Sequence, residues 1–154
     1  MNVPAAVRWR DAEPEQFAAA ITTAAEQLDV LPLAVEKDYW ACQALRAITL
    51  NHPGEVVFKG GTSLEKLRII RRFSEDLDLL VVGTYPSVHA TRRALKDIVG
   101  TAADATLHQP EPFKSGGKPG RFHRSAHLAP PLTHTAVPGA IADAAAILVE
   151  LERV

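Results

Sequence analysis

The chain has 154 residues, of which 47% are hydrophobic and 23% charged, and its formal net charge is −1. This length suits one domain with a proper core, and the absence of repeats, low-complexity tracts, a signal-like segment and long apolar runs excludes repeat, disordered and membrane-spanning classes. The single cysteine, Cys42, cannot form an internal disulfide, so we expect a cytoplasmic protein with no membrane contact.

Two helices are predicted in the first 54 residues. An apolar pattern with helical period runs from Pro14 to Leu28 and indicates an amphipathic helix. A second helix is predicted to begin at Pro32, a favoured first helical position, and to continue to the breaker at residues 52–54. On this helix, Lys37 and Asp38 fit a solvated face at least as well as a role in a site.

Residues 56–63 have the pattern of a strand, a glycine turn and the start of a helix. The apolar run at 56–58 precedes Gly60 and Gly61, and the next residues, Thr62 and Ser63, are good helix caps. The free N–H groups and the positive dipole end of such a helix are available to an anion.

A second strand is predicted for residues 76–82, with acidic residues at its entry. Side chains two apart in a strand share a face, so Asp76 and Asp78 point the same way, while Leu77 and Leu79 point into a core. Mg²⁺, with Mn²⁺ as an alternative ion, would compensate the two like charges, because such hard cations bind carboxylate and phosphate oxygens. Together with the preceding helix start, the pattern predicts a triphosphate site.

A third helix is predicted to be capped by Ser87 and to end near Gly100. Arg92, Arg93 and Lys96 share much of one face of this helix, at spacings of three and four. That face would favour phosphate contact if it borders the site, and a solvated basic face is the equal alternative.

The segment from 108 to 139 holds six of the eleven prolines and is predicted to form a mobile basic loop, with a polar hairpin as the alternative. Lys118 and Arg121 are candidate phosphate contacts within it. His123 and His127 are four apart, but the nearby prolines and glycines argue against a helix that would align them, so zinc is not predicted. The apolar run at 144–151 suits a final strand.

These residues resemble a known family. The Gly-Gly turn followed by Asp76-Leu77-Asp78 is similar to the signature of DNA polymerase β-like nucleotidyltransferases. The longer segments 58–64 and 72–79, with Lys66, resemble the AbiEii/AbiGii toxin family, which includes the MenT toxins of mycobacteria. Residues 36–40 also resemble the leading helix of that family.

The resemblance implies a polymerase β-like fold, a mixed α/β (α+β) domain whose helices flank a short mixed sheet. We expect a single domain over 1–154, with a helical lead-in at 1–54 and a catalytic core at 55–154. Relatives usually continue into a helical C-terminal region, so the chain is expected to be a short form.

The resemblance also implies site residues and their roles. Asp76 and Asp78 would hold the metal ions, and a third carboxylate on a neighbouring strand, for which Glu150 is the candidate, would help to deprotonate the attacking hydroxyl. The other implied residues bind the phosphates of the nucleotide or neutralise the leaving group: Gly60, Gly61, Thr62, Ser63 and Lys66.

The implied activity is transfer of nucleotides from a nucleoside triphosphate (NTP) to the 3′ end of tRNA. Such an enzyme is a toxin that blocks aminoacylation and growth, and a cognate antitoxin is its expected partner. On this interpretation Arg92, Arg93, Lys118 and Arg121 are candidate RNA contacts. Two alternatives stay open: a nucleotidyltransferase acting on a protein or a small molecule, and a catalytically incomplete module that binds RNA or a partner.

Overall fold

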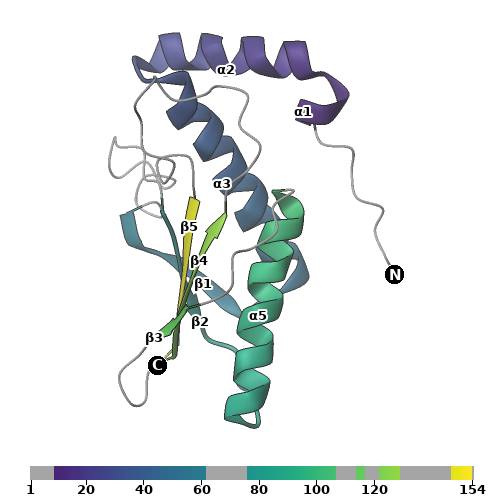
Figure 1. Cartoon of the computed structure of the whole chain (residues 1–154), viewed down its shortest axis with the longest axis vertical. Coiled ribbons are helices and arrows are strands. Elements are labelled where there is room, and N and C mark those ends of the chain that lie inside the picture. The colour runs from purple at the N-terminus through teal and green to yellow at the C-terminus, as the bar shows by residue number, and fades with distance from the viewer. Residues whose placement is uncertain (1–8, 62–75, 107–113, 117–121, 129–146, 154) are drawn as a thin grey trace.

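The computed structural model describes residues 9–61, 76–106, 114–116, 122–128 and 147–153, with side-chain packing for residues 9–61 and 77–106. The helices are α1 (Trp9–Ala12), α2 (Pro14–Leu28), α3 (Pro32–Asn51) and α5 (Val88–Ala105) (Figure 1). The strands are β1 (Val56–Lys59), β2 (Asp76–Val81), β3 (Lys114–Gly116), β4 (Phe122–Leu128) and β5 (Ile147–Arg153).

Helices α2 and α3 begin and end close to where the sequence predicts. Both have a proline in their first turn, where the missing N–H has no intrahelical partner to lose. Asp29 ends α2 in the left-handed conformation at φ 55°, and its N–H bonds to carbonyl groups of the last turn. In the described residues no single helix has the length and apolar character to cross a membrane, and α2 and α3 meet those criteria only as a pair bent by 113°.

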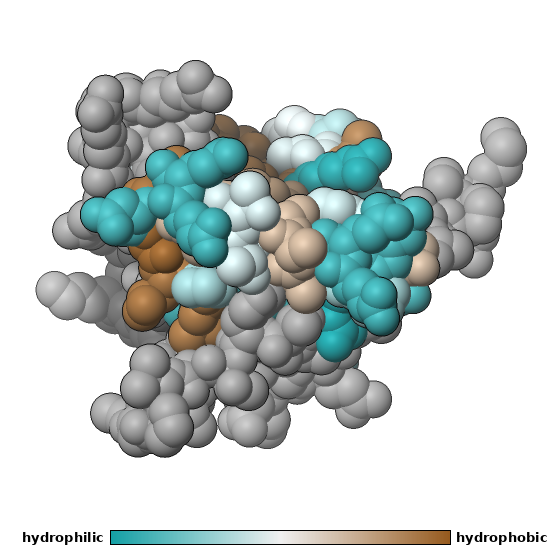
Figure 2. Space-filling view, turned by 90° about the horizontal axis from the view of Figure 1, so that it is seen from above, coloured by the Kyte–Doolittle hydropathy of each residue, from teal (hydrophilic) through white to brown (hydrophobic). Residues whose placement is uncertain are grey.

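The surface of this helical part is mostly polar, as the amphipathic pattern of α2 predicts. Phe17, Ile21 and Ala25 are the buried residues of α2, and they follow one another four positions apart. Figure 2, which looks down on the end of the molecule where α2 lies, shows hydrophilic residues over much of the described surface and apolar residues gathered toward one side. Leu28 and Leu31, at the corner between α2 and α3, are 56% and 64% exposed.

A five-stranded mixed sheet joins the strands in the order β1-β2-β5-β4-β3. β2 is antiparallel to β1 and parallel to β5, and β4 is antiparallel to both β5 and β3. β2 and β5, which are far apart in the sequence, are therefore neighbouring strands in the centre of the sheet (Figure 1). The predicted fold class, a mixed α/β (α+β) chain with a short mixed sheet flanked by helices, is confirmed.

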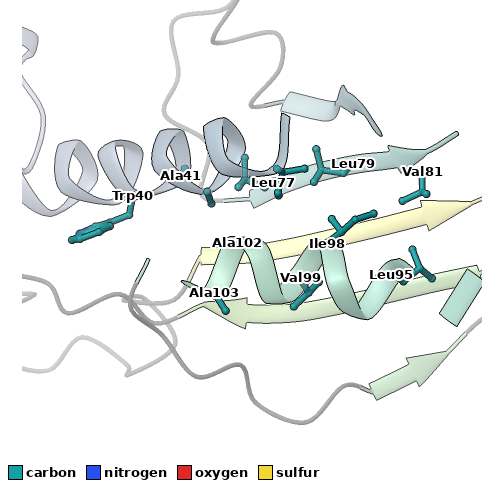
Figure 3. Close-up of a cluster of buried hydrophobic side chains, with 12 residues drawn as sticks. Trp40, Ala41, Leu77, Leu79, Val81, Leu95, Ile98, Val99, Ala102 and Ala103 are labelled. Atoms are coloured by element: carbon teal, nitrogen blue, oxygen red, sulfur yellow. The ribbon is translucent and has the colours of Figure 1, made fainter. Parts of the chain in front are cut away.

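The core lies between β2, α3 and α5. Leu77, Leu79 and Val81 are at most 2% exposed and pack in one cluster with buried residues of both helices (Figure 3). Alternate residues of β2 thus face the helices, as the predicted strand requires. The intervening residues, Asp76 among them, belong to the opposite face.

Helix α5 is longer than the sequence predicts. The expected N-cap is confirmed, because the Ala90 N–H donates to Ser87 Oγ at 3.1 Å. The expected end near Gly100 is wrong, since the helix continues to Ala105. One glycine in a helix costs only about 1 kcal/mol, whereas Ala102 and Ala103 extend the buried face of α5 into the core. Burial of that face therefore outweighs the weak helix propensity of Gly100.

Two further expectations are corrected. Lys37 is 5% exposed and its neighbour Glu36 is fully buried, so the solvated face, one of the two alternatives left open for Lys37, is wrong. Both residues have interaction partners, and buried charged residues are rare without them. The loop predicted for 108–139 contains β3 and β4, paired as a hairpin, which is the alternative considered from the sequence. Residues 117–121 lie outside the described part of the chain.

Candidate active site

The acidic face of β2 is opposite to the face that packs in the core. Asp78 is half-buried, between Leu77 at 1% and Leu79 at 0% exposure on the core side. Its register partner on β1 is Lys59, which is also half-buried. Directly paired residues of antiparallel strands have Cβ atoms about 4.5–5.5 Å apart. Lys59 and Asp78 are therefore neighbours on the same face of the sheet, and only the strand register reveals this pairing.

The glycine turn packs directly on the Asp78 side chain. Gly60 has φ +78°, a conformation that L side chains rarely adopt. A Cβ added there would overlap Asp78 Oδ2 and would lie 2.8 Å from Asp78 Cγ and 2.9 Å from its Cβ. Gly60 is therefore required both by the backbone and by the space that the carboxylate occupies. The turn and the acidic strand, which are separate in sequence, form one site.

β1 runs into a helical turn at Gly60 and Gly61, the last described residues before Asp76. The backbone N–H groups at such a helix start are donors that can bind an anion. Gly61 follows the glycine that contacts Asp78, so these donors lie at the Asp78 end of β1. An anion held there would meet the acidic strand.

The parallel pairing of β2 with β5 places a second acidic residue beside Asp78. Glu150 is the register partner of Asp78, and Leu148 is the partner of Asp76. Glu150 thus occupies the position next to Asp78 on the neighbouring strand, at the place where the family resemblance asks for a third carboxylate. Glu152, two positions further along β5, pairs instead with Leu80.

Several predicted site residues fall outside the described residues. These are Thr62, Ser63, Lys66, Lys118 and Arg121. In residues 9–61 and 77–106, where side chains are described, no group of three or more His, Cys, Asp or Glu side chains gathers as a metal site. Asp76 and Glu150 are placed by backbone and register only.

Arg92 and Arg93 are not brought to Asp78. Both are exposed on α5, and the buried side of α5 packs on the opposite face of the sheet from the acids. Arg93 lines an open cleft of about 590 Å³ whose other residues include Glu55, Tyr85 and Asp97. Glu55 precedes β1 and Tyr85 follows β2, so the cleft lies at the far end of these strands from Gly60. Tyr85 donates a 2.6 Å hydrogen bond to Glu55 Oε2 there.

The histidines of the basic segment lie on β4, a strand of the hairpin that the sequence offered as the alternative to a loop. His123 and His127 are on β4, four positions apart, so with Ser125 they share one face of the strand. Ser125 is the register partner of Glu150. The alternation of this short segment was hidden by the flanking prolines and glycines.

Comparison with known proteins agrees with this arrangement. The family model described as "Nucleotidyl transferase AbiEii toxin, Type IV TA system" matches residues 43–137. That range includes the glycine turn, the acidic strand, α5, β3 and β4. No curated protein and no solved structure matches the chain. Because the match covers more than half of the sequence and the acidic strand with its glycine turn lies inside it, the chain belongs to the AbiEii family of nucleotidyl transferase toxins of type IV toxin–antitoxin systems.

Proposed function

We propose that the chain is a Mg²⁺-dependent nucleotidyltransferase that adds nucleotides from an NTP to the 3′ end of tRNA. The observation that carries this proposal is the contact between Gly60 and the Asp78 side chain. It joins a helix start that suits phosphates to an acid that suits a metal ion. A nucleoside triphosphate with its metal ions needs both in one place.

The nucleotide side of the site is built from the glycine turn. Backbone N–H groups at Gly60 and Gly61 would bind the β and γ phosphates, with Thr62 and Ser63 adding hydroxyl donors. Lys66 would neutralise the charge that develops on pyrophosphate as it leaves. A side chain at position 60 would remove this arrangement, because it would occupy the space of the Asp78 carboxylate.

The acidic residues fit a magnesium site. Carboxylate oxygens are the hard ligands that Mg²⁺ prefers, and the missing Cβ of Gly60 leaves room for the Asp78 carboxylate beside the phosphate donors. Asp76 and Asp78 would hold the ion, with Glu150 as the third acid on the neighbouring strand. When bound, Mg²⁺ would stabilise the negative charge of the reacting phosphate oxygens.

The reaction joins the 3′ oxygen of the acceptor to the α-phosphorus of the NTP. The bond between the α-phosphorus and the bridging oxygen to the β-phosphorus breaks, and pyrophosphate leaves with its electron pair. The proton of the attacking hydroxyl passes to a carboxylate beside Asp78, for which Glu150 is the candidate. The side chains therefore have to orient two substrates and accept one proton.

The family resemblance supports tRNA as the acceptor and an antitoxin as the partner. A tRNA with extra nucleotides at its 3′ end cannot be aminoacylated, so growth stops. The antitoxin of a type IV system would counter this effect. The basic residues Lys118 and Arg121, close to β4 in sequence, are proposed contacts to the RNA phosphates.

The proposal is tested by incubating the purified chain with total tRNA, Mg²⁺ and each of the four α-labelled NTPs in turn. We expect label at tRNA 3′ ends, and at least about a 10³-fold loss of rate in Asp76→Ala and in Asp78→Ala. Because both acids serve one centre, the double variant should be no slower than either single variant. Asp97→Ala, an exposed acid on α5, is the matched control and should keep full activity.

Three results would contradict the proposal. Wild-type activity in Asp78→Ala would show that this acid takes no part in the mechanism. Label in a protein or a small molecule, with none in RNA, would show that tRNA is not the acceptor. Full activity after removal of divalent ions with EDTA would exclude the metal, whereas activity restored by Mg²⁺ or Mn²⁺ would support it.

A further inference from the structure

One transverse row of the sheet continues from the acids to polar residues of β4 and β3. The row follows successive register partners across the five strands: Lys59, Asp78, Glu150, Ser125 and Lys114. Residues paired in register lie on the same face of a sheet. This is the face opposite to the buried residues of β2, so the row belongs to the face of the site.

β4 places two histidines on that face, on either side of Ser125. His127 pairs with Leu148, which pairs with Asp76, and His123 pairs with Glu152. The three β4 positions, His123, Ser125 and His127, are here called the β4 platform. They lie two strands from β2, about 10 Å away at the usual strand spacing.

The residue chemistry of this face changes from one strand to the next. β2 and β5 contribute carboxylates, whereas the β4 platform contributes hydroxyl and imidazole groups, and Lys114 on β3 adds an ammonium group. Hydroxyl, imidazole and ammonium groups are donors to phosphate and ribose oxygens. The acids would repel a polyanion without metal ions, but the β4 platform would not.

The geometry also separates the two substrates. The phosphate-binding turn at Gly60 lies at the end of β1, on one side of Asp78, and Glu150 lies on the other side. An NTP held by the turn would therefore lie on the β1 side of Asp78, whereas β5 and β4 lie on its other side. An acceptor that approaches across β4 and β5 would pass the position of Glu150 before the position of Asp78.

Resting on the proposed nucleotidyl transfer, we propose that the β4 platform holds the ribose–phosphate backbone of the RNA acceptor. His123, Ser125 and His127 then position the terminal 3′ hydroxyl toward Glu150 and Asp78. They are positioning residues, because they hold the acceptor and do not touch the transferred phosphate. The platform is thus a binding site for single-stranded RNA ends, separate from the NTP site.

The test compares the double variant His123→Asn/His127→Asn and the variant Ser125→Ala with the wild-type chain. We expect the KM for total tRNA to rise about tenfold or more in the double variant, since several phosphate or ribose contacts are lost. The KM for the NTP should stay within twofold, because the platform lies on the other side of Asp78 from the phosphate-binding turn. His89→Asn, an exposed histidine on α5 across the sheet, is the matched control and should change neither constant. Circular dichroism establishes that each variant is folded.

Binding of labelled total tRNA on filters, without NTP, separates this inference from the proposed function. A wild-type chain that binds tRNA but transfers no nucleotide would refute the transfer, while weaker binding in the double variant would still support the platform. Unchanged tRNA binding and KM in both the double variant and Ser125→Ala would overturn the platform. Labelling of a protein acceptor instead of RNA would also overturn it. If the double variant does not fold, Ser125→Ala alone decides, with a threefold rise in KM as the expected result.

Discussion

Replacing Gly60 by alanine tests whether the glycine turn and the acidic strand form one site. The added Cβ would lie 2.8 Å from Asp78 Cγ, whereas carbon atoms pack at about 3.5–4.0 Å, so the two groups must separate by at least about 0.7 Å. A displacement of about 1 Å at a reacting centre can lower the rate about 10²-fold. We therefore expect kcat/KM for labelled NTP incorporation into tRNA to fall about 10²-fold in Gly60→Ala.

The change also strains the backbone, and a matched control isolates that effect. Gly54 has φ +75°, close to Gly60 at +78°, but a Cβ at Gly54 meets no atom within 4 Å. Both alanine variants should lose about 1–2 kcal/mol of unfolding free energy from the left-handed conformation, measured by urea titration. Only Gly60→Ala should lose activity. Equal activity in the two folded variants would refute the role of the Gly60–Asp78 contact.

Two further predictions concern the stability of α5. Gly100→Ala should raise the free energy of unfolding by about 0.5–1 kcal/mol, because Gly100 is helical and a Cβ there meets open space; a lower melting temperature would contradict this account. Ser87→Ala should lower the free energy of unfolding by about 1 kcal/mol, because the Ala90 N–H loses its acceptor. Ser87→Asn should restore most of that loss, and an alanine variant as stable as the wild-type chain would show that the cap contributes nothing.

Local patterns in the sequence were sufficient to predict most of the regular elements. Helices α2 and α3 and strands β1 and β2 follow from hydrophobic period, from prolines at helix starts and from breakers after helix ends. The predictions were less successful where packing outweighs propensity. α5 continues through Gly100 because Ala102 and Ala103, which follow it, are buried in the core. Lys37 is buried on α3 although lysine usually lies in solvent.

The candidate site was predicted as residue types and was completed by the register of the strands. The shared face of Asp76 and Asp78 follows from the two-residue period of a strand, so it required no knowledge of the fold. Glu150 was the candidate for a third acid from the family resemblance, and the register adds that it is the partner of Asp78, whereas Glu152 pairs with Leu80. Arg92 and Arg93 were candidate phosphate contacts from the sequence, but their helix packs on the other face of the sheet from Asp78.

The sequence by itself determined the chemistry of this protein: a glycine turn, two acids on one strand face and their order along the chain identify the AbiEii family. Only the tertiary structure decided which distant residues become neighbours of the acidic strand. Interactions between neighbours in sequence set helices, strands and turns, but the pairing of β2 with β5 joins segments about 70 residues apart. That pairing is set by tertiary packing, such as the burial of β2 against α3 and α5, and no local pattern contains it.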